Sequence, residues 1–147
     1  MRISTKVEYG LVALTDIAFY SEKNVVSTAD IAKRQNISQK YLEQILMRLK
    51  QAGLLKATKG AGGGYSLSRS ADKILMTDVL DALDNSLLAD NEHYEDDRLS
   101  ELKESANVCF WNKINEQLRR FTDNMTLRDF MSLCSEHKQS VWDLYVI

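Results

Sequence analysis

The 147-residue sequence predicts a mainly α-helical protein with one small β-hairpin. Two short helical segments, each preceded by a serine, lie about four residues apart, and a segment with an apolar period near two follows them. Further along, apolar residues recur every three or four positions over residues 99–121. We interpret this order as a winged helix-turn-helix in residues 1–84, followed by a loop, a long dimerisation helix and a C-terminal arm in residues 85–147.

The first two helices are expected near residues 4–20 and just after Ser27. In the first, the apolar residues are spaced as on one face of a helix. Ser27 and Asp30 have the spacing of a capping box, which predicts a short second helix with Lys33 and Arg34 on its outer side.

A third helix is expected to begin after Ser38. Asn36 suits the turn that ends the second helix, Ser38 is a favourable N-cap, and Gly53 is a natural stop. The buried face of this third helix is expected to consist of Tyr41, Leu42, Ile45, Leu46 and Leu49.

A β-hairpin is expected next, around the glycine-rich residues 60–64. On either side of this tip, polar residues alternate with the apolar residues Leu55, Ala57, Tyr65 and Leu67. This alternation is typical of half-buried strands.

The sequence after the hairpin predicts a long helix with one short helix before it and one after it. Thr77 is expected to cap the first short helix, and the polar residues 85–97 indicate a loop. The long helix has a continuous apolar stripe, which we expect to be the dimer contact; the stripe includes Leu102, Ala106, Phe110, Ile114, Leu118 and Phe121.

A final short helix is expected after Thr126. Thr126 and Asp129 form a second capping box, and we expect the helix to end near Cys134. Residues 141–147 are expected to form an apolar tail.

The formal net charge of −2 conceals an uneven distribution. Through Lys73 the chain has twelve basic and six acidic residues, a net charge of +6, whereas the remainder has a net charge of −8. Such an asymmetry suggests that the first half meets a polyanion while the second half has another role.

Composition also excludes several classes of protein. Cys109 and Cys134 are the two cysteines, which are too few for a disulfide framework and too far apart for a CxxC zinc site. No stretch approaches eighteen apolar residues, and the first residues lack the apolar run of a signal peptide. We therefore expect a cytoplasmic protein with no membrane segment.

The third helix has the composition of a DNA recognition helix. Side chains near the start of such a helix meet base edges in the major groove. Here the expected DNA-contacting residues are Ser38, Gln39, Lys40, Tyr41, Glu43, Gln44 and Arg48.

These residues have different expected contacts. Gln39 and Gln44 suit adenine, and Lys40 and Arg48 suit phosphate. Glu43 has two interpretations: it accepts a hydrogen bond from cytosine N4 and sets specificity, or it pairs with a neighbouring lysine on a solvated face.

The hairpin tip is a second expected contact with DNA. Lys56 and Lys59 are basic, and Gly60 and Gly62 let the backbone approach a phosphate or enter the minor groove. The alternative is a flexible turn without contact. A nucleotide-binding loop is excluded, because the run does not match GxGxxG and a strand, not a helix, follows it.

Four stretches together resemble the Rrf2 family of bacterial winged-helix regulators: ISTK at 3–6, YGL at 9–11, ISQKYLEQ at 37–44 and KGAGGGYSL at 59–67. The family's usual proline in the wing is Ala61 here. The resemblance implies a homodimer built on the long helix and a palindromic operator, with half-sites about 34–36 Å apart. It implies a DNA-binding regulator, expected to be a repressor, and not an enzyme.

The signal to which such a regulator responds is open between several alternatives. Many family members carry an iron–sulfur cluster on three cysteines near the start of the dimer helix, and some relatives use a carboxylate at the position of Glu8. Here Cys109 stands alone in that region, and the further candidate ligands are Cys134, His93 and Glu8. Lone cysteines are more often small buried hydrophobes, so we expect no metal or cluster; a redox thiol at Cys109 is a further option.

The C-terminus is similar to that of the CymR-type members, which lack a cluster and are controlled by the enzyme cysteine synthase. The tail ends at Ile147, and a terminal carboxylate beside an apolar side chain is a known recognition element. The resemblance thus implies control of cysteine and sulfur metabolism with cysteine synthase as partner. The alternative is that the tail packs on its own chain or on the dimer partner.

Two other function classes are disfavoured. No base–nucleophile pattern, GxSxG or HExxH motif occurs, so an enzyme is not expected. A helix-turn-helix that binds protein instead of DNA is disfavoured by the basic wing.

Overall fold

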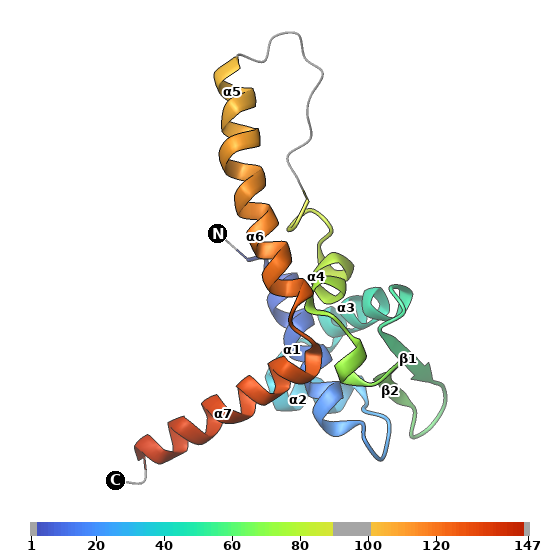
Figure 1. Cartoon of the computed structure of the whole chain (residues 1–147). Coiled ribbons are helices and arrows are strands. Elements are labelled where there is room, and N and C mark those ends of the chain that lie inside the picture. The colour runs from blue at the N-terminus through green and yellow to red at the C-terminus, as the bar shows by residue number, and fades with distance from the viewer. Residues whose placement is uncertain (1–2, 90–100, 146–147) are drawn as a thin grey trace.

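The computed structural model describes residues 3–89 and 101–145. A group of helices and a hairpin forms one body, and two long helical segments leave it in different directions (Figure 1). In chain order the elements are α1 (Thr5–Tyr20), α2 (Thr28–Gln35), α3 (Gln39–Gln51), β1 (Leu55–Thr58), β2 (Gly64–Leu67), η1 (Ala71–Lys73), α4 (Met76–Leu83), α5 (Glu101–Ala106), η2 (Asn107–Trp111), α6 (Asn112–Asp123) and α7 (Leu127–Tyr145).

Side-chain caps set the starts of the first three helices, and the sequence predicts two of them, Ser27 and Ser38. The hydroxyl oxygens of Ser4, Ser27 and Ser38 each accept a hydrogen bond from a backbone N–H three residues later. α2 ends at Asn36, which is left-handed with φ of 52°, and the chain after α3 turns at Gly53 with φ of 78°. Asn and Gly are the residues that adopt this region at least cost.

The core lies between α1, α3 and α4 and is closed by the start of α7. Its largest fully buried side chains include Leu14, Ile17, Leu42, Leu46 and Leu83. Full burial of each such side chain contributes about 1.5–3 kcal/mol. This core fixes α3 by one face and leaves the opposite face in solvent.

The wing is an antiparallel hairpin in which Leu55 pairs with Leu67 and Thr58 with Gly64. Val26 extends it on the other side of β2, because Val26 and Tyr65 exchange two backbone hydrogen bonds of 2.8 Å. A Cβ at Gly64 would collide with the carbonyl oxygen of Val26. Gly64 therefore permits the close approach of these two backbones.

The expectation that Thr77 caps α4 was wrong. α4 begins at Met76, and its N-cap, Leu75, makes no capping hydrogen bond through its side chain. The Thr77 hydroxyl instead lies 2.7 Å from the Thr122 hydroxyl and donates to Asp123 at 2.5 Å. The N–H of Met76 is satisfied by the carbonyl of Met125 at 2.9 Å, a partner 49 residues away that helix capping rules do not foresee.

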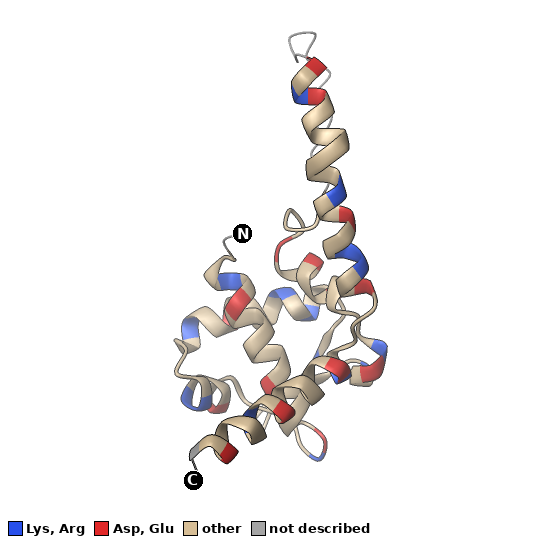
Figure 2. Ribbon diagram, turned by 60° about the vertical axis from the view of Figure 1, so that its left-hand side comes forward, with Lys and Arg blue, Asp and Glu red and all other residues tan. Residues whose placement is uncertain are grey.

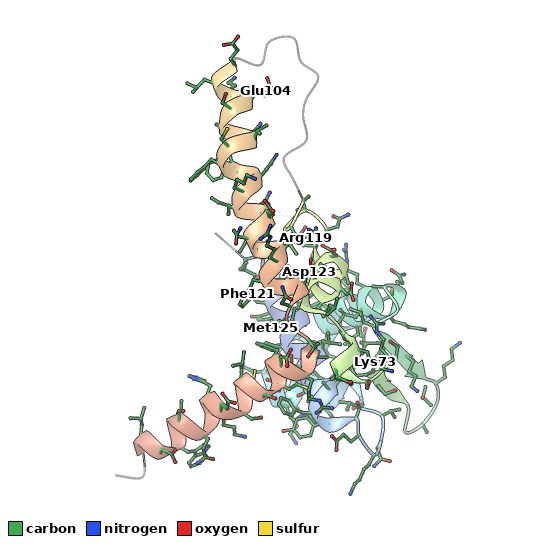
Figure 3. All side chains as sticks on the ribbon, in the orientation of Figure 1. Lys73, Glu104, Arg119, Phe121, Asp123 and Met125 are labelled. Carbon is green, nitrogen blue, oxygen red and sulfur yellow. The ribbon has the colours of Figure 1, made fainter. Side chains whose placement is uncertain are left out.

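The predicted long helix is present as the arm α5–η2–α6, with an unexpected π-helical segment at η2. Glu104 lies near the far end of this arm and Asp123 lies at its base (Figure 3). Part of the predicted loop, residues 90–97, and Leu99 lie outside the described residues.

α7 is much longer than predicted. The capping box is confirmed, because Thr126 N–H donates to the Asp129 carboxylate at 2.9 Å and Asp129 N–H donates to the Thr126 hydroxyl at 3.1 Å. However, the helix does not end near Cys134, and it includes most of the expected tail as far as Tyr145. The sequence has no proline, and no glycine follows Gly64, so no residue in this region breaks the helix.

Candidate nucleic-acid interface

The predicted recognition residues lie together on the solvent side of α3. Leu42, Ile45, Leu46 and Leu49 are buried and hold the helix to the core. On the opposite side the exposed residues are Ser38, Gln39, Lys40, Glu43, Gln44 and Arg48. Seven predicted contacts therefore lie on α3 or at its N-cap, six of them exposed, while Tyr41 is half-buried.

Glu43 forms no ion pair with Lys40 or Lys50 in the described part of the chain. A solvated pair was the alternative to a base contact for this residue. The observation leaves the carboxylate accessible to an external donor.

Tyr41 is held by an aromatic contact with α1. Its ring meets the ring of Tyr9 edge to face, with ring centroids 5.9 Å apart. Such a pair contributes about 0.5–1.5 kcal/mol beyond burial and fixes the ring at the start of α3.

A buried carboxylate ties α2 to α1, and sequence reasoning missed it. The side chain of Asp16 is fully buried and accepts hydrogen bonds from Arg34 Nε and Nη2 at 2.9 and 2.7 Å, and from Gln35 Nε2 at 2.7 Å. Arg34 also stacks on the ring of Tyr20, with 4.2 Å from its Cζ atom to the centroid. The bond to Asp16 is the main reason why the pKa of Arg34 is raised.

Arg34 lies on the exposed side of α2, as the sequence predicts, but its guanidinium is held by Asp16. An acidic residue within the apolar face of a helix was the available signal, since a buried carboxylate needs a partner. The pairing holds α2 against α1, on which α3 also packs, and so contributes to the geometry of the helix-turn-helix.

The wing carries its predicted residues at or near its exposed tip. Lys56, Lys59, Gly60 and Gly62 are all exposed. Gly60 and Gly62 have φ of 97° and 76°, and Gly60 accepts a hydrogen bond of 3.0 Å from Gly63 N–H. The turn is thus hydrogen-bonded, and it keeps the ammonium of Lys59 in solvent.

The arm leaves most of its predicted dimer stripe uncovered. The exposed fractions are 80% for Leu102, 55% for Phe110, 39% for Ile114 and 64% for Phe121. Ala106 is also exposed and Leu118 is half-buried. The middle of the arm has no charged residue, which Figure 2 shows as a tan stretch between charged turns.

The candidate cluster ligands do not come together in the described residues. Cys109 is exposed on η2, whereas Cys134 is half-buried on α7, which leaves the body in another direction (Figure 1). Glu8 is exposed on α1, and His93 lies outside the described residues. The described ranges contain no group of three or more His, Cys, Asp or Glu side chains placed to hold a metal. Within the described part of a single chain, Cys109, Cys134 and Glu8 therefore do not form a shared ligand set.

Cys134 has the character of a packed hydrophobe. It lines an apolar groove with Leu11, Phe19 and Phe130, and burial raises the pKa of its thiol. A raised pKa lowers the thiolate fraction, which makes a thiol less reactive and a poorer ligand.

Over the described residues, no helix has the length and apolar character needed to cross a membrane.

Comparison with known proteins identifies the family. The family model Rrf2, described as an iron-dependent transcriptional regulator, matches residues 3–133. The regulator IscR of Photobacterium profundum is 35% identical over 131 residues, which cover 89% of this chain and 76% of that protein.

Solved structures agree with this match. CymR (YrzC), the global cysteine regulator of B. subtilis, has a TM-score of 0.75 and 32% identity, covering 90% of this chain and 98% of that chain. IscR of T. potens has a TM-score of 0.74 and 33% identity, covering 93% and 90%. With its winged helix-turn-helix and its long arm, the chain belongs to the Rrf2 family of transcriptional regulators.

Proposed function

We propose that this protein is a homodimeric repressor that binds a palindromic DNA operator. The observation that carries the proposal is the exposed face of α3, where Gln39, Glu43 and Gln44 lie in solvent beside a basic wing. The IscR relative is named as an HTH-type transcriptional regulator and CymR as a global cysteine regulator, which supports DNA as the partner and argues against catalysis.

The chemistry of α3 suggests a division between base and phosphate contacts. Gln39 and Gln44 each present an amide that pairs with adenine N6 and N7, and Glu43 accepts from cytosine N4. Lys40 and Arg48 neutralise phosphates on the flanking backbone. Glu43 is costly beside a polyanion unless it makes a base contact, and it therefore sets specificity in this proposal.

The wing would contact the backbone or the minor groove next to the α3 site. Lys59 supplies a positive charge at the tip, and Gly60 and Gly62 leave no side chains between the backbone and the DNA. Lys56 lies further back on β1 and would contact phosphate.

Two chains would pair through the apolar stripe of the arm, from Leu102 to Phe121. Phe110 and Trp111 meet edge to face, with centroids 5.0 Å apart, and both side chains are about half exposed. Exposed aromatic residues on an uncharged segment are typical of an interface core. A twofold axis at the arm would place two α3 helices on one DNA face, about 34–36 Å apart.

A titration of operator DNA tests the proposal. The affinity for promoter fragments, measured by fluorescence anisotropy, should fall steeply with salt, and Lys59→Ala should reduce the slope by about one. Lys138→Ala on α7 is the matched control and should leave the slope unchanged. Binding that does not depend on salt would refute DNA recognition through these basic residues.

For the signal, we propose CymR-like control of cysteine and sulfur metabolism. Cys109 is the only cysteine in the arm, which does not favour a cluster, and the CymR structure is matched over 98% of its length. In this proposal the C-terminal tail, which ends at Ile147 outside the described residues, would recognise cysteine synthase.

The alternative signal is an iron–sulfur cluster or a redox thiol at Cys109. The metal and sulfide content of protein purified without oxygen separates a cluster regulator, which would contain both, from control by a protein partner or by a redox thiol. Deletion of Val146 and Ile147 should abolish association with cysteine synthase and leave operator affinity unchanged. Retained association would exclude the tail as the recognition element.

A further inference from the structure

A polar cavity of about 410 Å³ lies away from the α3 face. It is bounded by the end of α1, by the hairpin and the segment after it, and by the first turn of α7. Its lining has three cationic side chains, Lys56, Arg69 and Arg128, and one carboxylate, Glu22. We propose that this cavity binds a small, free anion with two negative charges, of which inorganic phosphate is the simplest example.

Arg69 is fixed in place before any ligand arrives. Its Nε donates to the carbonyl of Lys73 at 2.9 Å and its Nη1 donates to the carbonyl of Gly53 at 3.2 Å. Asp78 lies 3.5 Å from Nη2 and takes up part of the charge. A guanidinium has five N–H donors, so Arg69 retains donors for a ligand while its position is held. A held cation needs less ordering when an anion binds.

Lys56 and Arg128 supply charges that the protein itself leaves unused. Neither forms an ion pair within the described ranges. Asp72, the carboxylate whose pKa is lowered mainly by the hydroxyl of Ser70, is also influenced by Arg128 but makes no ion pair with it.

Hydroxyl groups complete the set of donors. Ser21 and Ser66 line the cavity, and neither hydroxyl has a hydrogen bond in the described residues. Cations together with free hydroxyls are the donors that bind phosphate and carboxylate oxygens. Glu22 in the lining and Asp78 beside Arg69 lower the net positive charge of the site, which disfavours ligands with more than two negative charges.

The position of the cavity favours a free anion over a DNA phosphate. No residue of α3 lines it, and its lining joins Lys56 and Ser66 of the hairpin to Arg128 of α7. An anion held there would connect the wing to α7 and so to the half of the chain that lies outside the helix-turn-helix. The cavity shares Lys56 with the proposed DNA contact of the wing, but its other charged residues, Glu22, Arg69 and Arg128, have no assigned DNA contact, and the site does not require that DNA is bound.

Isothermal titration of the full chain with inorganic phosphate in a zwitterionic buffer tests the site. Wild type should bind in a saturable manner, Arg128→Gln should weaken binding at least fivefold, and Arg128→Lys should retain most of it. Arg120→Gln is the matched control, because Arg120 is exposed on α6, is paired with Glu116 at 2.7 Å, and does not line the cavity. Absence of saturable binding by wild type, or equal losses in Arg128→Gln and Arg120→Gln, would overturn the proposal.

Operator DNA provides the second arm of the test and separates the two sources of phosphate. In phosphate-free buffer, Arg128→Gln should bind DNA with unchanged affinity and salt slope. A weaker affinity together with a slope reduced by about one would assign Arg128 to the DNA backbone and overturn the free-anion site. An unchanged urea midpoint for Arg128→Gln shows that this variant is folded. If it is not folded, Ser66→Ala replaces it in the phosphate titration. Ser66→Ala should then lose affinity for phosphate, and an unchanged affinity would refute the site.

Discussion

Replacement of Asp16 by alanine should detach α2 from α1. The carboxylate is fully buried and accepts three hydrogen bonds, two from Arg34 and one from Gln35, at 2.7–2.9 Å. Removal of one partner from a buried ion pair costs about 3–5 kcal/mol. Because the Arg34 side chain is 32% exposed, water replaces part of what it loses, and we expect a decrease of about 3 kcal/mol in the free energy of unfolding.

Urea denaturation, followed by far-ultraviolet circular dichroism, measures this loss. Asp81→Asn is the control, since the pair between Arg119 and Asp81 is 3.7 Å long and its side chains are 42% and 40% exposed. Exposed pairs contribute less than about 1 kcal/mol. If Asp16→Ala loses no more stability than Asp81→Asn, the buried carboxylate does not hold the two helices together.

Three further predictions concern the wing, the arm and the cap of α7. Gly64→Ala should weaken operator binding by at least tenfold in a gel shift, because the new Cβ meets the carbonyl oxygen of Val26 and pushes β2 away. Phe110→Asp should convert a dimer to a monomer in analytical ultracentrifugation, because it places a charge in the uncharged stripe. The pKa of Asp129 is lowered chiefly by the Thr126 N–H, so its contribution to stability is full above the unfolded pKa of about 4 and is lost as pH falls through the folded value. Urea midpoints of wild type and Asp129→Asn should therefore differ at neutral pH and converge in acid.

Each of these predictions has a clear contrary result. Unchanged operator binding by Gly64→Ala would show that the hairpin tolerates the displacement. A dimeric Phe110→Asp variant would exclude the arm stripe as the contact. A difference between wild type and Asp129→Asn that does not depend on pH would show that ionisation of the cap contributes nothing.

Local signals predicted most of the helix-turn-helix and the wing. Ser27 and Ser38 are caps whose partners lie three residues away, and the alternation around residues 60–64 depends only on strand geometry. These contacts join residues that lie close together in the sequence, so local sequence patterns are sufficient to predict them. The exposed positions on α3 follow from the same periodicity.

The errors concern contacts between residues far apart in the sequence. Thr77 is of a residue type that often caps helices, but its hydroxyl donates to Asp123, 46 residues away. Asp16 accepts three hydrogen bonds only because α2 packs against α1, and the apolar pattern of a helix does not specify how it packs against another helix. The length of α7 was underestimated for another reason: polar residues 135–140 interrupt the apolar pattern, although none of them ends a helix.

The hydrogen bonds between Thr77, Thr122 and Asp123 constrain what the arm can do. They join α4 to the base of α6. Two backbone hydrogen bonds, from Met76 N–H to Met125 O and from Leu127 N–H to Ile74 O, hold the segment that follows α6. The base of the arm therefore cannot swing relative to the body without breaking several hydrogen bonds. In a dimer joined through such arms, the separation and relative rotation of the two α3 helices are fixed by the protein. A single base pair inserted between the half-sites, which rotates one of them by about 34–36° around the DNA axis, would have to be absorbed by twisting the DNA.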